Sequence, residues 1–168
     1  MDRHVLSVFV RNQYGVLARI SSMFRRRGFN IDSLTVGETE NPEYSRMTVT
    51  FNGDDVIKNQ IIRQLAKMPD VECLTELEKA ESVSRELVLV KIRNSKENRQ
   101  DIMSVVDIFR AKVVDYGNEA MIIEITGESS KLDAFIDLVE EFGIIEVCRT
   151  GIVALQRGNG SILNETNA

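Results

Sequence analysis

The same order of hydrophobic patterns occurs twice along this chain of 168 residues. Each half opens with an almost continuously apolar segment, at residues 5–10 and 87–92, which is typical of a strand covered by other structure. A segment with helical periodicity follows and ends in Phe-Arg, and an apolar strand closes each half. The shared identities are short, so the prediction of two similar units in tandem depends on the matching order of elements.

Glycines and turn residues divide the first half into four strands and two helices. Gly15 is expected to open the first helix, and Gly28 is expected to end it as a C-cap. The apolar stripe of this helix is predicted at near-helical spacing, as Leu17, Ile20, Met23 and Phe24. The strands are predicted at residues 5–10, 29–37, 44–51 and 71–77, with the second helix between Asp54 and Pro69.

The second half repeats this order of elements. Two helices are indicated by apolar stripes, one from Ile102 to Phe109 and one from Leu132 to Val139. The order β-α-β-β-α-β is that of the ferredoxin-like fold, an antiparallel sheet with both helices on one face. The fold class is therefore predicted as α+β, with two tandem ferredoxin-like domains. The strands are expected at residues 87–92, 113–114, 121–125 and 144–148, with an extension of the sheet at 152–155.

The domain boundaries follow from these patterns. We expect domains at residues 1–78 and 85–158, a polar linker at 79–84, and a disordered tail rich in Gly and Asn at 159–168. Each domain has only about 75 residues and therefore a small core. Because a bare sheet face and edge strands would remain, pairing with a second copy is the simplest way to cover them. A homodimer is predicted.

Composition argues against several classes of function. Lys and Arg number 21 against 26 Asp and Glu, and the net charge of −5 gives no basic footprint for nucleic acid. No apolar run of about 18 residues is present, so no membrane span is expected. The first residues lack the layout of a signal peptide, and we expect a cytoplasmic protein.

Residues suited to catalysis or to metal binding are scarce. Cys73 and Cys148 are far apart in the sequence and His4 is the only histidine, so neither a zinc site nor a nucleophile activated by histidine is expected. No glycine-rich phosphate loop is present, and the neighbouring carboxylates at 54–55 and 140–141 would point to different faces. The sequence thus favours a binding module with no catalytic residues, metal or cofactor of its own.

The segment from Asn12 to Leu17 is the most informative candidate for a binding site. Gly15 allows a sharp turn and close approach of the backbone to a ligand. The free N–H groups after it, at Val16, Leu17 and Ala18, are suited to a carboxylate, and Asn12 offers both a donor and an acceptor. The alternative is that Asn12 caps the loop and Gly15 only permits the turn. Asn30 has the same two interpretations, a ligand contact or a turn residue.

Several segments resemble a known family. Residues 12–19, Asn-Gln-Tyr-Gly-Val-Leu-Ala-Arg, resemble the first loop of an ACT domain, the amino-acid-sensing ferredoxin-like module. Residues 27–36 and 45–48 are similar to the regulatory, or small, subunit of acetolactate synthase, also called acetohydroxyacid synthase. The second half supports this resemblance at residues 89–92, 108–115, 131–135 and 149–158.

The resemblance implies a non-catalytic subunit of branched-chain amino acid biosynthesis. It would bind and activate a large catalytic subunit that uses thiamine diphosphate, Mg²⁺ and FAD, and would confer feedback inhibition by valine. In this family the effector lies between two paired ACT domains. Carried over to this chain, the site would combine Asn12, Gly15, Val16 and Leu17 of one copy with Asn30 and Ile31 of the other, the effector's branched side chain lying against Val16, Leu17 and Ile31.

Two alternatives stay open from the sequence. One is an ACT-type amino-acid sensor that serves a different enzyme, and co-purification with a large thiamine-dependent subunit would decide this. The other is a small enzyme, since the ferredoxin-like fold hosts many functions. The sequence does not choose among valine, leucine and isoleucine, and it does not identify the surface that meets a catalytic subunit.

Overall fold

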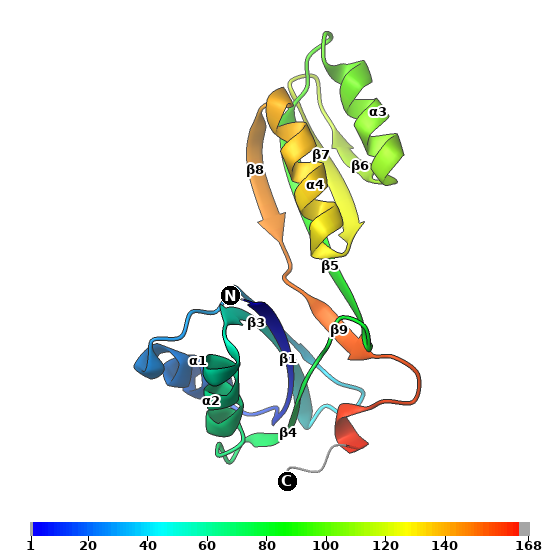
Figure 1. The fold of residues 1–168 in the computed structure, drawn as a ribbon. Coiled ribbons are helices and arrows are strands. Elements are labelled where there is room, and N and C mark those ends of the chain that lie inside the picture. The colour runs from blue at the N-terminus through cyan, green and yellow to red at the C-terminus, as the bar shows by residue number, and fades with distance from the viewer. Residues whose placement is uncertain (1, 165–168) are drawn as a thin grey trace. The chain divides into compact units, whose positions relative to one another are not determined.

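The computed structural model describes residues 2–164 and divides the chain into two compact units. One unit comprises the residues up to Ser84 together with those from Ile152 onward, and the other comprises Arg85–Gly151. Figure 1 shows a β-α-β-β-α-β order in each. The predicted tandem ferredoxin-like fold is therefore confirmed. None of the helices in the described part of the chain is long and apolar enough to cross a membrane.

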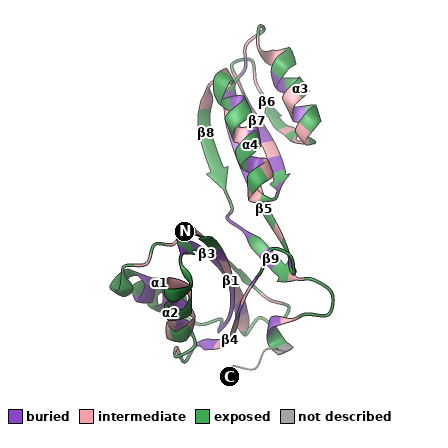
Figure 2. Ribbon diagram, in the orientation of Figure 1, coloured by how far each residue is buried: buried purple, intermediate pink, exposed green. Residues whose placement is uncertain are grey.

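The first unit contains an antiparallel sheet with strand order β2-β3-β1-β4. Helices α1 and α2 cover one face of this sheet, and the buried core lies between the helices and the sheet. Figure 2 shows that the outer sides of both helices are exposed. The elements of this sheet and its helices are β1 (Asp2–Arg11), α1 (Val16–Arg27), β2 (Ser33–Glu38), β3 (Tyr44–Gly53), α2 (Asp55–Leu65) and β4 (Val71–Glu76).

Helix α1 has the predicted ends, and three of its four predicted stripe residues, Ile20, Met23 and Phe24, are buried. Gly15 and Gly28 flank it with φ angles of 82° and 70°, and Gly28 donates its N–H to the carbonyl of Arg25 at the C-terminal end. The predicted stripe residue Leu17 is 46% exposed, and Val16 is buried in its place. The physical reason is that the helix begins at Val16, so positions i, i+4, i+7 and i+8 from there face the sheet.

The second strand is shorter than predicted. It begins at Ser33 rather than at Phe29, and residues 29–32 form an irregular connection after α1. Phe29 and Ile31 are nevertheless half-buried against the core, which explains why their sequence pattern resembled a strand. Asn30 and Ile31 therefore lie in a loop and not at the start of a strand.

The second unit has the strand order β6-β7-β5-β8, again with its two helices packed into one core. Arg110 ends α3 with φ 54° and is the one described residue other than glycine with positive φ. The elements are β5 (Ser82–Arg93), α3 (Arg99–Phe109), β6 (Lys112–Tyr116), β7 (Ala120–Gly127), α4 (Ser129–Val139), the short 3₁₀ helix η1 (Glu140–Phe142) and β8 (Ile144–Arg149).

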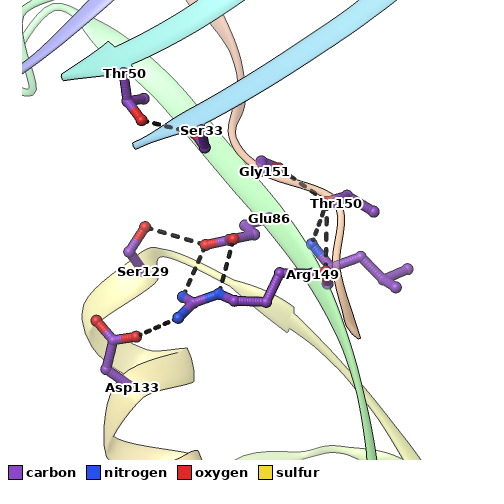
Figure 3. A network of polar contacts seen from close by, with 9 residues as sticks. Ser33, Thr50, Glu86, Ser129, Asp133, Arg149, Thr150 and Gly151 are labelled. Carbon is purple, nitrogen blue, oxygen red and sulfur yellow. Dashed lines mark hydrogen bonds and ion pairs between the residues drawn. The ribbon is translucent and has the colours of Figure 1, made fainter. Parts of the chain in front are cut away.

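A partly buried ion pair joins β5 to β8 within this unit (Figure 3). The Glu86 carboxylate is 4% exposed and accepts two hydrogen bonds from Arg149, from Nε at 2.9 Å and from Nη2 at 3.0 Å. Arg149 Nη1 reaches Asp133 at 2.9 Å, and Ser129 Oγ donates to Glu86 at 3.3 Å. The hydrogen bond to Glu86 is the main reason why the pKa of Arg149 is raised.

The extension of the sheet predicted at residues 152–155 is confirmed. Strand β9 (Val153–Gln156) pairs with β5, and its residues group with the first unit. Residues 79–81 form a turn, and Ser82 already begins β5, so residues 82–84 belong to a strand instead of an irregular linker. The 3₁₀ helix η2 (Ile162–Asn164) lies in the segment predicted as a disordered tail; the rest of that prediction, residues 165–168, lies outside the described residues.

The C-terminal segment packs on the open face of the first sheet, opposite α1 and α2 (Figure 1). Ile162 contacts Phe9 and Cys73, while Ile152 and Ala154 pack with Leu77. The expectation of a bare face on this unit is therefore wrong, because the chain's own C-terminal residues cover part of it. Strands β2 and β4 are still the edge strands of this sheet. The prediction of a homodimer therefore now depends on covering these edges.

Candidate functional site

The N-terminus of α1 directly follows an exposed loop, residues 12–15, that connects it to β1. Gly15 is the N-cap residue in the left-handed conformation, and no side chain caps the helix. The first backbone N–H groups of a helix have no partner inside it and carry partial positive charge. Val16 N–H donates to the Gln13 carbonyl at 3.4 Å, so Leu17 and Ala18 offer the donors suited to a carboxylate.

Asn12 ties this loop to the β2–β3 connection. Its Nδ2 donates to the carbonyl of Pro42 at 2.9 Å and to Glu38 Oε1 at 3.1 Å. Both partners are acceptors, which fixes the orientation of the amide and leaves Oδ1 facing neither of them. Asn12 therefore stabilises the loop, which is the structural role given above as the alternative to a ligand contact. It does not cap α1. Its exposed Oδ1 is an acceptor for an ammonium group.

The two apolar residues that begin α1 have different roles. The Val16 side chain is 4% exposed and packs in the core, so Val16 offers the loop only its backbone. The expectation that an effector's side chain lies against the Val16 side chain is therefore wrong, because the first turn of α1 directs this residue to the sheet. Leu17 is 46% exposed and provides the apolar surface beside the helix N-terminus.

Asn30 and Ile31 lie at the other end of α1. The helix has 12 residues, about 18 Å at 1.5 Å per residue, and it separates these two residues from Gly15. Asn30 is exposed and donates to Asp32 Oδ1 at 3.5 Å, whereas Ile31 is half-buried against the core. One chain therefore does not bring the two halves of the predicted site together. Their pairing across two copies stays a prediction.

An ion pair that the sequence did not predict lies beside this loop. Arg19 Nε lies 2.7 Å from Asp70 Oδ2, and Asp70 is 8% exposed while its carbonyl accepts the Arg11 N–H at 2.9 Å. The Arg19 guanidinium also lies over Gly15, because a Cβ at Gly15 would be 3.2 Å from Nη1. It adds positive charge at the helix N-terminus. No signal in the sequence links Arg19 to Asp70, since 51 positions separate them.

The described residues at this site do not form a cluster of metal-binding side chains. Among residues 2–164, no group of three or more His, Cys, Asp or Glu side chains could hold one. The site can hold a small ligand that carries both a carboxylate and an ammonium group. The N-terminus of α1 would take the carboxylate, and Asn12 Oδ1 would take the ammonium.

Comparison with known proteins gives the same family over both units. Residues 85–158 match the family described as small subunit of acetolactate synthase, and residues 6–72 match the AHAS small subunit-like ACT domain. The probable acetolactate synthase small subunit of Archaeoglobus fulgidus is 47% identical over 157 residues, which cover 94% of this chain and 98% of that protein. The acetolactate synthase small subunit of Mycolicibacterium smegmatis is 47% identical over 155 residues, with 92% and 91% covered.

A solved structure agrees with these relatives. The small subunit of acetolactate synthase from Thermotoga maritima superposes with a TM-score of 0.87 at 42% identity. The match covers 95% of this chain and 100% of that one. The chain therefore belongs to the family of acetolactate synthase small subunits, which are regulatory subunits, and it carries an ACT domain.

Proposed function

We propose that this chain activates the catalytic subunit of acetolactate synthase and makes it sensitive to valine. The proposal is carried by one observation, the uncapped N-terminus of α1 at Gly15 with Asn12 beside it. This arrangement has separate places for the two charged groups of a free amino acid. A branched-chain amino acid fits because the exposed Leu17 side chain is aliphatic.

The site is completed by a second copy of the chain. The effector's carboxylate binds the N–H groups of Leu17 and Ala18, near the Arg19 guanidinium, and its ammonium binds Asn12 Oδ1. Asn30 and Ile31 of the paired ACT domain close the site from the other side. This assignment accounts for residues that lie a helix length apart within one chain.

The chemistry of the reaction belongs to the catalytic subunit in this proposal. Thiamine diphosphate, Mg²⁺ and FAD bind there, and this chain contributes no catalytic residue and no cofactor site. The two subunits act in the cytoplasm, in the biosynthesis of valine, leucine and isoleucine. Valine is an end product of this biosynthesis, and its binding between the paired ACT domains inhibits the catalytic subunit.

Calorimetric titration of the full chain with valine, leucine and isoleucine tests the effector site. Asn12→Ala removes a hydrogen bond to a charged group and is expected to weaken valine binding about 10- to 100-fold. Asn30→Ala is expected to weaken it similarly, from the partner's side. Asn59→Ala, an exposed position on α2, is the matched control and should leave valine affinity unchanged.

Reconstitution with the catalytic subunit tests the regulatory role. Added to that subunit, the wild-type chain is expected to raise acetolactate formation and to introduce inhibition by valine. Asn12→Ala should keep the activation and lose the inhibition. Loss of activation with valine binding intact would contradict the proposal, because the loop would then be the contact with the catalytic subunit. No effect of the wild-type chain on rate or inhibition would favour a sensor that serves a different enzyme.

A further inference from the structure

The open face of the first sheet contains a hollow of about 240 Å³ that the effector loop does not use. It lies on the side opposite α1, where the segment after β9 crosses the strands. Strands β1, β3 and β4 contribute its floor, and the C-terminal segment contributes the opposite wall. The floor residues are Ser7, Arg46, Thr75 and Leu77, and the wall consists of Leu155, Gln156, Gly158, Gly160, Ser161 and Ile162.

Two polar side chains of the floor have no partner among the described residues. Ser7 is 0% exposed, and its hydroxyl makes no hydrogen bond there. The Arg46 guanidinium, on the neighbouring strand β3, has no ion pair or hydrogen bond within residues 2–164. Buried polar groups in folded proteins are almost always hydrogen-bonded, so a buried hydroxyl beside an unpaired cation indicates a missing acceptor.

The lining defines the charge and the size of that acceptor. The hollow contains one cation and no acidic side chain, which suits a ligand with one net negative charge, whereas an ammonium group would be repelled by the Arg46 guanidinium. Leu77 of the floor and Leu155 and Ile162 of the wall give the hollow an aliphatic side. Pockets for drug-sized ligands begin at about 300 Å³, so this one fits a smaller molecule.

We infer that this hollow binds a short-chain aliphatic monocarboxylate without an α-ammonium group. Arg46 and the Ser7 hydroxyl bind the carboxylate, and the aliphatic wall contacts the short carbon chain. The ligand contacts both the sheet and the C-terminal segment, so its binding holds residues 157–163 against the sheet. In the proposed function the effector loop on the other face binds an ammonium group, whereas the Arg46 cation disfavours one in this hollow.

The test uses two probes with the same carbon skeleton, 3-methyl-2-oxobutanoate and valine, on the full chain. Calorimetry measures affinity, and hydrogen exchange measures protection of residues 157–163. We expect the oxo acid to bind and to protect this segment, with at least about a tenfold loss of affinity in Arg46→Gln. Ser7→Ala should weaken binding as well. Arg63→Gln, an exposed arginine on α2, is the matched control and should bind as the wild type does.

Each further outcome distinguishes this hollow from the effector loop. Asn12→Ala is expected to lose valine and keep the oxo acid, and Arg46→Gln is expected to do the reverse. The inference is overturned if the oxo acid does not bind at millimolar concentration, or if Arg46→Gln binds it normally while its thermal unfolding matches the wild type. It is also overturned if valine or inorganic phosphate gives the same Arg46-dependent protection, because the ligand class would then be wrong.

Discussion

Replacing Arg149 by methionine is expected to destabilise the second unit selectively. The substitution keeps most of the side-chain volume and removes both hydrogen bonds to the Glu86 carboxylate, at 2.9 and 3.0 Å. Glu86 is 4% exposed, so its charge would remain in place without its cation (Figure 3). Breaking a fully enclosed pair in this way costs about 3–5 kcal/mol.

The expected cost is lower here for two structural reasons. The Arg149 side chain is 36% exposed, so water can reach the carboxylate after the substitution, and Ser129 still donates to it at 3.3 Å. We therefore expect a loss of about 2–3 kcal/mol, in the upper part of the range of about 1.5–3 kcal/mol for hydrogen bonds to charged groups. At about 1.4 kcal/mol per factor of ten, amides protected by unfolding of this unit should exchange roughly 30- to 150-fold faster.

Peptide-resolved hydrogen exchange is the appropriate assay because it separates the two units. Peptides from β5 and β7 should lose protection, while peptides from β1 and β3 serve as an internal reference. Asp133→Ala removes only the ion pair between Arg149 Nη1 and the Asp133 carboxylate, whose side chain is 53% exposed. This variant should cost less than about 1 kcal/mol. The double variant Glu86→Leu with Arg149→Met should be more stable than Arg149→Met, since the buried charge is gone. Equal exchange in Arg149→Met and Asp133→Ala would refute this reasoning.

Two further predictions concern the first unit. Gly28→Ala is expected to cost about 1–2 kcal/mol from left-handed strain alone, because nothing lies within 4 Å of its Cβ. Gly15→Ala bears the same strain and displaces the Arg19 guanidinium, so chemical denaturation should show a cost at least as large, and only this variant should weaken valine binding. Lys58, 2.9 Å from Asp55, lowers the pKa of that carboxylate. The contribution of this pair to stability should therefore be present above the ordinary pKa of aspartate and disappear as pH falls through the lowered one; in an NMR titration, Lys58→Met should raise the pKa of Asp55.

The fold was predictable because its signals are local. Strand and helix periods, with glycines at positions 15 and 28, were enough to predict the order of elements in both halves. The first residue of the α1 stripe was not predictable, because Val16 and Leu17 are both apolar and only the exact start of the helix decides which of them faces the sheet. The tail was misjudged for a different reason. Its Gly- and Asn-rich composition suggested disorder, whereas Ile162 packs against Phe9 of β1 and Cys73 of β4, far away in the sequence.

Only the local features of the candidate site were predictable from the sequence. Gly15 and the helix N-terminus follow from a local turn, and the structure places them as expected. The hydrogen bonds of Asn12 to Pro42 and Glu38 join segments about thirty positions apart, and no local pattern indicates them. The same holds for the Arg19–Asp70 pair. Long-range polar contacts of this kind decide which atoms of a loop stay available to a ligand.

The separation of Asn12 from Asn30 by the length of α1 has a thermodynamic consequence for effector binding. If the effector contacts both residues, it binds only to paired chains, and pairing and binding must strengthen each other by the same factor. Light scattering of the full chain is expected to give twice the 19.0 kDa of one chain, and valine should shift the dissociation of this dimer to lower protein concentration. Asn12→Ala should form the dimer and lose the response to valine, because its change lies in the ligand contact. A dimer whose dissociation is indifferent to saturating valine would show that the effector contacts one chain alone, and the role assigned to Asn30 and Ile31 would be wrong.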